Sequence, residues 1–320
     1  MSPAPAVAVA VVSWNTRDLL AACLASLEPE VRAGRAEVWV VDNASSDGSA
    51  ELVRSRFAWA RLVASEQNLG FGPAVNRVAA ATDCAWIAPA NADVALEPGA
   101  LEALLAAGAA DPGAGALAPR LVLPDGRTQH SAYAFPTLGF TAAFNLGLHR
   151  IVPGLGDRLL LEGFWDADRP RRVPWAIAAL LLVRRTAWEA AGGFAEDQWM
   201  YAEDLDLGWR LARAGWATRH VPAARVRHES SAATAQAWGE ERTARWLAST
   251  YAWMLRRRGA PVTRAVAAVN IAGALARAAL LAPAARIAPG RFGAARAANA
   301  GWARLHRIGL RPRRALLAHR

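Results

Sequence analysis

Short apolar runs alternate with longer amphipathic segments over the first ninety residues. Residues 7–12 form a continuous apolar run, which is typical of a strand buried on both faces of a parallel sheet. Residues 19–27 repeat apolar side chains every three or four positions, which favours a helix with one buried face. Further strands are predicted at residues 38–41, 61–64 and 85–88. This order predicts an α/β fold with an open, mostly parallel sheet between two helical layers.

Polar residues or glycines follow each of these four strands. They are Ser13-Trp14-Asn15, Asp42-Asn43, Asn68-Leu69-Gly70-Phe71-Gly72 and Asn91-Ala92-Asp93. In open α/β sheets, ligands bind outside the carboxyl ends of the strands. A single polar strand end would be unremarkable, but four in succession predict a binding site along this edge.

The second half of the chain is less regular. Strands are predicted at residues 117–123, 175–183, 217–221 and 225–228. A helix is predicted at residues 205–214, because Gly215 is a favourable residue just beyond a helix end. Residues 135–172 are rich in Gly, Pro and aromatic side chains, so we expect mobile loops there.

Several enzyme classes lack their motifs here. The Gly-x-Gly-x-x-Gly fingerprint does not follow the first strand, and no phosphate-loop sequence ends in Gly-Lys-Ser/Thr. These absences argue against a nicotinamide-dependent dehydrogenase and a P-loop ATPase. The two cysteines, Cys23 and Cys84, are too few for a disulfide framework, which favours a reducing compartment. Residues 1–5 have no basic region, so we expect no secretory signal.

Charge divides the chain at Glu241. The sequence contains 37 Arg and no Lys, and all 27 acids lie at or before Glu241. Residues 242–320 therefore hold 16 Arg and no acid, whereas residues 1–241 hold 21 Arg and 27 acids. This split predicts an acidic body followed by an Arg-rich helical tail.

Three acids stand among apolar residues in the stretch 199–210, WMYAEDLDLGWR. Glu203, Asp204 and Asp206 suit a helix N-terminus, where carboxylates cap N–H groups and complement the dipole. A carboxylate at the mouth of a cleft also suits proton abstraction from a hydroxyl. The segment alone does not choose between these interpretations.

Three further side chains are candidates for ligand contacts. Asp42 can accept the imide N–H of a pyrimidine base, or it can stabilise a turn. Asp93 can hold a divalent cation such as Mg²⁺, or it can form a turn with Asn91. His228 can contact a metal such as Mn²⁺, although a single His is more often structural.

Together these motifs resemble the family-2 glycosyltransferases with the GT-A fold, and within them a rhamnosyltransferase-like branch. The resemblance runs from Val7 to Ser231 and keeps the family order. Its elements are VSWN at 12–15, VDNASSDG at 41–48, NLGF at 68–71 with Asn76, NADV at 91–94, GGF at 192–194, YAEDLDL at 201–207, and His228. Each motif is weak alone, but the ordered set is specific.

The resemblance implies a role for each of these residues. Asp204 would be the general base, and Glu203 would orient a sugar. Asp42 would recognise the base of a dTDP- or UDP-sugar. The remaining implied contacts are Asn68, Asn76 and Asn91 around the nucleotide-sugar, Asp93 and His228 at Mg²⁺ or Mn²⁺, and Trp175 at the acceptor.

Three departures from the branch pattern matter. Asn91 replaces the first acid of the usual Asp-x-Asp, which fits this branch, and Ala92 replaces its usual Pro. Ala178-Ala179 stands where relatives often carry Gly-Ala. An added methyl group at a close approach would narrow the acceptor site without changing the reaction.

The resemblance also implies the organisation of the chain. Residues 1–241 would form the GT-A domain, with a nucleotide-binding half at about 1–125 and an acceptor half at about 126–241. The implied reaction is an inverting transfer of a sugar, with rhamnose suggested by the branch, to a lipid-linked or polysaccharide acceptor. A sugar nucleotidyltransferase and a non-catalytic nucleotide-sugar-binding scaffold are the alternatives.

The tail at residues 242–320 predicts a peripheral membrane contact. Arg scattered among Ala, Leu and Trp suits an interfacial helix on an anionic leaflet. Residues 262–282 are apolar except for Arg264, Asn270 and Arg277, and are too interrupted for a clear membrane span. A solvated appendage and an oligomer contact are alternatives. The sequence contains no nucleic-acid-binding motif, so we expect no nucleic-acid partner. From the membrane contact of the tail, we expect the protein at the cytoplasmic face of the cell membrane.

Overall fold

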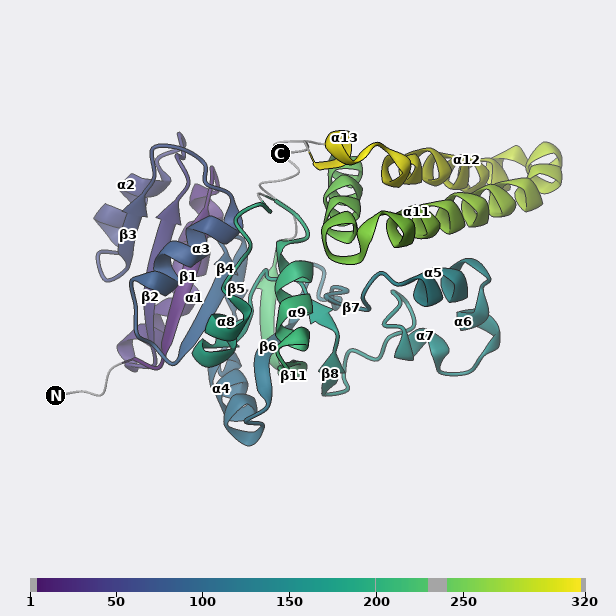
Figure 1. The fold of residues 1–320 in the computed structure, drawn as a ribbon. Coiled ribbons are helices and arrows are strands. Elements are labelled where there is room, and N and C mark those ends of the chain that lie inside the picture. The colour runs from purple at the N-terminus through teal and green to yellow at the C-terminus, as the bar shows by residue number, and fades with distance from the viewer. Residues whose placement is uncertain (1–4, 199, 230–240, 318–320) are drawn as a thin grey trace. The chain divides into compact units, whose positions relative to one another are not determined.

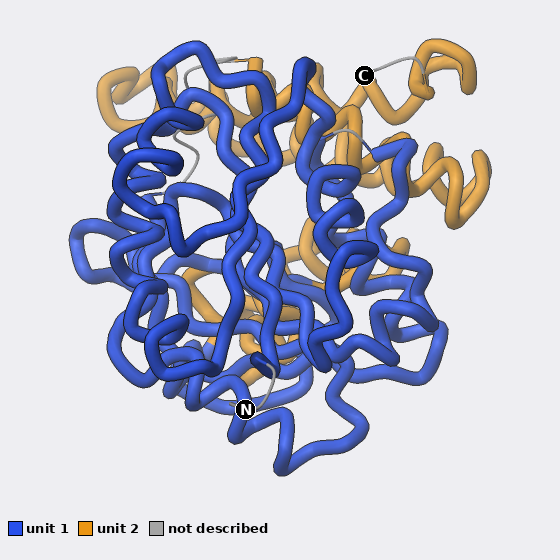
Figure 2. Tube along the Cα trace, turned by 90° about the vertical axis from the view of Figure 1, so that its left-hand side faces the viewer, with its two compact units in different colours: residues 1–133, 166–239 blue, residues 134–165, 240–320 orange. Residues whose placement is uncertain are grey.

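A computed structural model describes residues 5–198, 200–229 and 241–317. Figure 2 colours its two compact units, of which the first comprises residues 1–133 and 166–239 and the second residues 134–165 and 240–320. The predicted division of function at residue 241 remains a proposal.

The first unit is an α/β structure with strands and helices in alternation (Figure 1). Its strands are β1 (Val7–Ser13), β2 (Ala36–Asp42), β3 (Arg61–Ala64), β4 (Trp86–Asn91), β5 (Val94–Leu96), β6 (Ala114–Val122), β7 (Ala132–Tyr133), β8 (Arg171–Val173), β9 (Trp175–Ala176), β10 (Leu182–Arg184) and β11 (Ala217–His228). Its helices are α1 (Arg17–Arg32), α2 (Ser49–Arg56), α3 (Phe71–Ala80), α4 (Ala100–Ala110), α8 (Arg185–Ala191) and α9 (Glu203–Arg213).

The central sheet has nine strands in the order β3-β2-β1-β4-β10-β6-β11-β5, with β8 paired to β11. Strands β3, β2, β1 and β4 are parallel, as the continuous apolar runs predict. Strand β10 is antiparallel to both of its neighbours, β4 and β6. The expected open, mostly parallel sheet is therefore confirmed.

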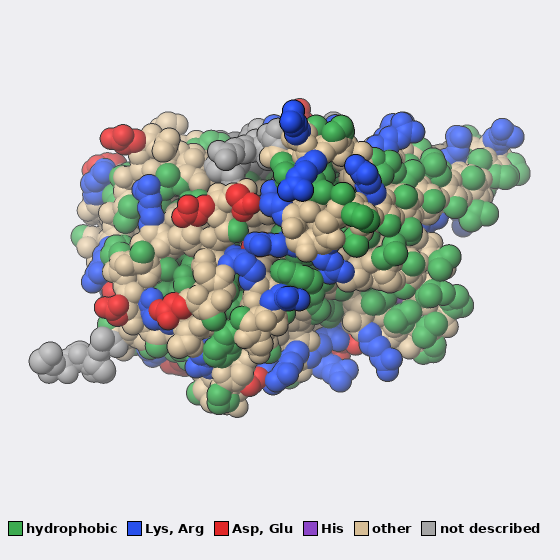
Figure 3. Space-filling view, viewed as in Figure 1, with side chains coloured by type: hydrophobic (Ala, Val, Ile, Leu, Met, Phe, Trp, Pro, Cys, Tyr) green, Lys and Arg blue, Asp and Glu red, His purple; other side chains and the backbone are tan. Residues whose placement is uncertain are grey.

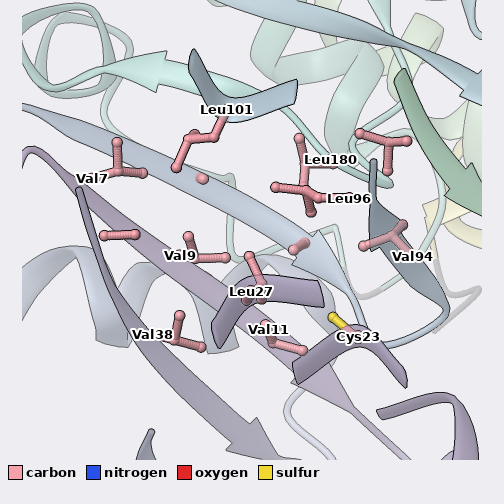
Figure 4. Packing of buried hydrophobic residues seen from close by; sticks show 14 of the residues in the cluster. Val7, Val9, Val11, Cys23, Leu27, Val38, Val94, Leu96, Leu101 and Leu180 are labelled. Carbon is pink, nitrogen blue, oxygen red and sulfur yellow. The ribbon is translucent and has the colours of Figure 1, made fainter. Parts of the chain in front are cut away.

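The two faces of the sheet carry separate hydrophobic clusters. Val7, Val9 and Val11 of β1 face α1, α2 and α4, and Figure 4 shows part of this packing. Ala8 and Ala10 point to the opposite face, toward α3, α8 and α9. Because side chains alternate along a strand, one apolar run supplies both clusters. The result is the predicted three-layer arrangement.

The predicted strand at residues 175–183 is two short strands instead. Strand β9 pairs with β7, and β10 joins the central sheet. The prediction was wrong because residues 178–181, between these strands, are apolar and buried without lying in a regular strand. Strand β11, in contrast, runs continuously through the two segments predicted at 217–221 and 225–228.

The second unit is helical. It contains α5 (Leu138–Asn145), α6 (Leu148–Ile151), α7 (Leu155–Arg158), α11 (Arg242–Ile287), α12 (Pro289–His306), the 3₁₀ helix η2 (Arg307–Leu310) and α13 (Arg313–Leu317). The expectation of loops across residues 135–172 is thus wrong for α5–α7. Gly at 147 and 154 divides this segment into pieces too short for a clear helical period.

Helix α11 is interrupted at Gly259, where φ is 82° and ψ is 167°. Beyond this break it runs beside α12, and α5 also packs against α11 (Figure 1). Among the described helices, α11 has the length and apolar composition to cross a bilayer. Only 22% of its most apolar stretch is buried.

Candidate functional site

Asp42 lies at the carboxyl end of β2, beside Ser13 at the end of β1. The residue is 3% exposed. Its Oδ2 accepts a hydrogen bond of 3.2 Å from the Ser45 N–H, whereas its Oδ1 has no partner among the described residues. A buried carboxylate oxygen without a donor is costly, so this position is suited to a ligand N–H.

Asn43 and Asn68 hold the loop that leads into α3. The Asn43 side-chain amide donates to the Gly70 carbonyl at 3.2 Å, and Asn68 Oδ1 accepts the Gly70 N–H at 2.9 Å. Gly70 has a φ of 83°, which disfavours other residues. The Asn68 side chain thus stabilises the loop at the sheet edge where the nucleotide is predicted to bind.

A cavity of about 570 Å³ opens at the end of β3. It is lined by Ala64, Ser65, Glu66, Gln67 and Arg77. The Ser65 N–H donates to the Asp42 carbonyl, so the cavity lining begins directly beside Asp42. A polar hollow therefore lies next to the backbone of Asp42, at the end of the neighbouring strand.

The side chain of Asn76 is hydrogen-bonded to the backbone of Phe194. Its Nδ2 donates to the Phe194 carbonyl and its Oδ1 accepts the Phe194 N–H, both at 2.9 Å. This pair of bonds joins α3 to the loop that follows α8. Asn76 therefore fixes the framework behind the edge, and its predicted contact with a nucleotide remains a proposal.

Asp93 and His228 come together because β5 pairs with the end of β11. Their Oδ1 and Nε2 atoms are 3.2 Å apart, and both side chains are buried. Neither atom has a hydrogen-bond partner among the described residues. His228 Nδ1 contacts Gln129 Oε1 at 2.7 Å. With Gln129 as acceptor, Nδ1 carries a proton, and a neutral imidazole in this tautomer presents its Nε2 lone pair to Asp93.

This pair fits a divalent cation. A lone pair facing a carboxylate oxygen is unfavourable until a proton or a metal lies between them. Across the described parts of the chain, no three His, Cys, Asp or Glu side chains form a metal cluster. Mg²⁺ commonly takes only one or two carboxylates together with phosphate oxygens, so a sparse protein ligand set is no obstacle.

The acidic helix α9 begins at Glu203 after two residues in the left-handed region. Tyr201 has a φ of 62° and Ala202 a φ of 63°, which is rare for residues other than Gly, Asn and Asp. Ala202 is the N-cap, so none of the three acids occupies the capping position. Such backbone strain often accompanies a functional site, and here it places the acids within the first helical turn.

The carboxyl groups of Glu203 and Asp204 differ in their surroundings. The N–H groups of Leu205 and Ala178 donate to the Asp204 carboxylate, the first at 2.7 Å. Glu203 Oε2 is buried and has no hydrogen-bond partner among the described residues. Burial raises the pKa of Asp204 to about 6. Burial and the neighbouring Asp204 charge raise the pKa of Glu203 to about 8.

The pKa of Glu203 is raised further than that of Asp204, so Asp204 is the more readily ionised member of the pair. Asp204 can accept a proton, whereas Glu203 can donate a hydrogen bond. Asp206 is different, because it is fully buried and its Oδ2 accepts from Arg210 Nε at 2.7 Å. Arg210 also donates to the Ala191 carbonyl, so Asp206 anchors α9 to α8.

Residues 178 and 179 connect the two halves of the site. The Ala179 carbonyl accepts the Asn91 N–H at 2.9 Å, and the adjacent Ala178 N–H donates to Asp204. Asn91 in turn pairs with Val12, one position before the Ser13–Asp42 pair. The structure thus brings Asp42, Asn91 and Asp204 to one edge of the sheet.

Trp175 lies beside this edge but is largely covered. Its ring stacks on Tyr133 with centroids 4.8 Å apart, and the residue is 8% exposed. A Cβ at Gly208 of α9 would meet Trp175 Cβ at 2.5 Å. Gly208 therefore permits α9 to pack closely on β9, where Trp175 contacts the acidic helix. Its predicted acceptor contact remains a proposal.

Two residues of this edge have no role in the sequence prediction. Asn43 Oδ1 is buried beside Asp42 with no hydrogen-bond partner in the described part of the chain, and the strand-end pattern already contained this residue. Gln129 orients His228, but no local signal identifies it. It reaches His228 because residues 121–129 fold back on β6, which is parallel to β11.

The protonated state of Glu203 predicts how stability depends on pH. Between the ordinary Glu pKa and about 8, folded protein holds a proton that unfolded protein has released, so the free energy of unfolding falls as pH rises. Glu203→Gln should remove this pH dependence. Above pH 8 the free energy of unfolding of the variant should exceed that of the wild type by at least about 1 kcal/mol. Urea unfolding from pH 5 to pH 9 measures this free energy.

Glu51→Gln provides the control, because that side chain is 74% exposed on α2. The control should follow the wild-type profile. A Glu203→Gln profile parallel to the wild type over this range would show that Glu203 is ionised in the folded protein.

Comparisons with known families agree with this geometry. The model described as "Glycosyl transferase family 2" matches residues 8–150, and "Glycosyl transferase family group 2" matches residues 163–295. An N-acetylglucosaminyl-diphospho-decaprenol L-rhamnosyltransferase from Mycobacterium tuberculosis is 37% identical over 212 residues, which cover 62% of this chain and 67% of that protein. Rhamnosyltransferase WbbL from Escherichia coli is 28% identical over 135 residues, covering 40% and 46%.

A solved structure supports the fold. Mannosyltransferase PcManGT from Pyrobaculum calidifontis, in complex with GDP-Man and Mn²⁺, aligns with a TM-score of 0.60 at 21% identity. The alignment covers 97% of this chain and 86% of that one. The predicted GT-A fold and transferase class are confirmed, which sets aside the nucleotidyltransferase and scaffold alternatives. The chain belongs to glycosyltransferase family 2 and is a glycosyltransferase.

Proposed function

We propose that this protein is an inverting, metal-dependent rhamnosyltransferase that uses a pyrimidine nucleotide-sugar. The observation that carries the proposal is the pair of adjacent acids at the start of α9, beside the strand edge that holds Asp42 and Asp93. Asp204 is half-buried and accepts the Leu205 N–H, whereas Glu203 is buried and its Oε2 has no hydrogen-bond partner among the described residues. The names of the curated relatives support rhamnose as the sugar and a lipid-linked sugar as the acceptor.

Asp204 is the proposed base. Its carboxylate takes the proton from an acceptor hydroxyl as that oxygen attacks the anomeric carbon, and the bond to the nucleoside diphosphate breaks. Two backbone N–H donors keep the carboxylate oriented. A single displacement inverts the anomeric configuration and needs no protein nucleophile. The protonated Glu203 can donate a hydrogen bond to a sugar oxygen, which suits its proposed orienting role.

The donor is proposed to lie across the strand ends. Asp42 Oδ1 would accept the imide N–H of uracil or thymine, and Asn91 would lie beside the sugar diphosphate. Asp93 and His228 would hold Mg²⁺ or Mn²⁺, which, when bound, offsets charge on the leaving diphosphate. The structural neighbours solved with Mn²⁺ are consistent with this requirement.

The organisation of the chain follows from these assignments. Residues 1–125 would bind the nucleotide, and residues 126–241 the acceptor. The Arg-rich residues 242–320 would hold the enzyme on the cytoplasmic face of the membrane, where a lipid-linked acceptor lies. Ala178 and Ala179 would narrow the acceptor site relative to a Gly-Ala pair.

A panel of nucleotide-sugars tests the donor assignment. With Mn²⁺ or Mg²⁺ present, dTDP-rhamnose should raise the unfolding temperature more than UDP-glucose or GDP-mannose, because a ligand that binds only folded protein stabilises it. At one hundred times Kd the stabilisation is about 2.7 kcal/mol. Transfer from dTDP-rhamnose to a synthetic lipid-linked N-acetylglucosamine would then be assayed.

The product also reports the mechanism. An inverting reaction gives an anomeric configuration opposite to that of the donor, which NMR of the product resolves. Stabilisation by a guanine nucleotide-sugar alone, or a product with retained configuration, would contradict the assignment of donor or mechanism respectively.

A further inference from the structure

Exposed hydrophobic side chains are concentrated in the second unit. All twelve large hydrophobic residues recorded as exposed within the described chain belong to it. They are Leu138, Phe144, Leu146, Ile151, Val152, Phe164, Trp246, Leu275, Leu280, Ile287, Trp302 and Leu310. Leu146 is 71% exposed, Ile151 72% and Leu280 80%. Six of the twelve lie in residues 134–165, outside the Arg-rich tail, so the apolar surface is shared between the two segments.

The charge of this unit has one sign over most of its length. Residues 242–320 carry 16 Arg and no acid. Figure 3 shows Arg and hydrophobic side chains intermixed over α11 and α12. Exposed apolar side chains among Arg suit the interface of an anionic bilayer, which accepts both. A surface for another protein would more often neutralise some of these cations with its own acids.

Within this surface, Arg277 is held in a fixed orientation by neutral groups. Its Nε donates to Asn299 Oδ1 and its Nη1 to Asn145 Oδ1, each at 3.0 Å. Asn145 is itself fixed by a 2.9 Å bond to Asn270 Oδ1. The Arg277 guanidinium also lies 5.9 Å from the centroid of the Phe144 ring. These contacts join α5, α11 and α12 around one cation.

The charge of Arg277 is not neutralised by any described residue. No carboxylate pairs with it, and the side chain of Arg150 on α6 has neither an ion pair nor a hydrogen bond with the described chain. Helix α5 packs on α6, which carries Arg150, and on α11, which carries Arg277. Burial and the Arg150 charge both lower the pKa of Arg277. Two guanidinium groups without acids favour a phosphate, which can accept several N–H bonds.

We propose that Arg277 and Arg150 bind the phosphate of an anionic lipid headgroup, with exposed apolar side chains of residues 134–165 and α11 entering the bilayer interface around it. The segment at 134–165 thereby becomes part of the membrane contact, together with the tail. The proposal rests on the membrane association proposed above, but not on the transfer reaction. The phosphate site can therefore be disproved while Asp204 remains the proposed base, and Asp204 can be disproved as the base while the phosphate site stands.

Vesicle binding by the full-length protein tests the phosphate site. Arg150→Gln with Arg277→Gln is compared with Arg264→Gln and Arg286→Gln, which remove the same charge from exposed positions of α11. On phosphatidylglycerol vesicles, the first pair should weaken binding at least about tenfold more than the second, because it also loses direct phosphate contacts. Equal losses of vesicle binding by the two double variants would show that only general charge attraction to the membrane operates, and would overturn the proposed phosphate site.

Three controls accompany this test. Thermal unfolding detects a folding defect in the Arg277 variant. Arg150→Gln alone removes a side chain without a described partner, and it should still weaken vesicle binding more than Arg286→Gln does. Inorganic phosphate at matched ionic strength should leave vesicle binding unchanged. If inorganic phosphate instead displaces the vesicles, the site takes free phosphate and the lipid assignment is wrong.

A second pair of variants tests the apolar contact. Leu146→Glu with Ile151→Glu should reduce vesicle binding about as strongly as Leu280→Glu on α11, since both place charge in the interface. Unchanged binding by the first variant would exclude residues 134–165 from the membrane. The bound protein should be released by carbonate at high pH. Retention would indicate a membrane-spanning α11, and preferential binding to duplex DNA would indicate a different partner, so either result overturns the proposal.

Discussion

Asp204→Asn should reduce sugar transfer by about 10²- to 10⁴-fold while donor affinity stays within about twofold of the wild type. The amide is isosteric with the carboxylate, and its oxygen can still accept the N–H groups of Leu205 and Ala178. The start of α9 should therefore be preserved. The amide cannot take a proton from the acceptor hydroxyl, so the loss should fall on the rate of transfer. Product formation at saturating donor and calorimetric donor binding measure the two effects.

Asp83→Asn is the matched control, because this exposed acid precedes β4 at the opposite end of the strand from the candidate site. It should transfer sugar at the wild-type rate. Transfer by the wild type should also decline as pH falls through about 6, since the base acts only when ionised. Wild-type turnover by Asp204→Asn would show that another group takes the proton.

Asp93→Asn should weaken the binding of UDP or dTDP in the presence of Mn²⁺ by about 100-fold or more. The physical reason is the loss of the carboxylate beside His228, whose Nε2 lies 3.2 Å from Asp93 Oδ1. In the wild type, EDTA should weaken nucleotide binding to a similar extent. In the variant, EDTA should have little further effect. Calorimetry of the nucleoside diphosphate reports this interaction without requiring turnover.

Asp125→Asn serves as the control, because this acid lies in an exposed turn after β6 and is paired with Arg127. It should retain metal-dependent binding. A thermal melt of Asp93→Asn should resemble the wild type, since Asp93 Oδ1 has no hydrogen-bond partner among the described residues to lose. Metal-dependent affinity that survives in Asp93→Asn would place the cation elsewhere.

The layered sheet was predictable from sequence because its evidence is local. Apolar runs identify β1 and β2, and the helical spacing that includes Leu20, Cys23 and Leu24 identifies α1. The polar strand ends at Asp42 and Asn91 were predictable for the same reason, because parallel strands end at a common edge. The mixed half of the sheet was harder, since β10 and β11 reach their partners across long stretches of chain.

The helices of the second unit were harder to predict from the sequence. Helices α5–α7 are too short for a repeating apolar face, and the pairing of α5 with α11 depends on contacts more than 100 residues apart, such as Asn145 with Asn270. Gly273 leaves space for Asn145, whose Oδ1 would lie 2.0 Å from an added Cβ. A glycine inside an apolar helical segment gives no hint of this partner.

The amino-acid order by itself determined the alternation of strands and helices, the polar edge, the charge division at Glu241 and the motifs that resemble family-2 glycosyltransferases. Only the tertiary structure decided what each acid in residues 203–206 does. Asp206 pairs with Arg210, Glu203 Oε2 is buried without a partner among the described residues, and Asp204 receives N–H groups from Leu205 and from Ala178. The sequence places these acids within four positions, but a carboxyl group's pKa depends on burial and on donors brought from distant segments. Those surroundings exist only in the folded chain.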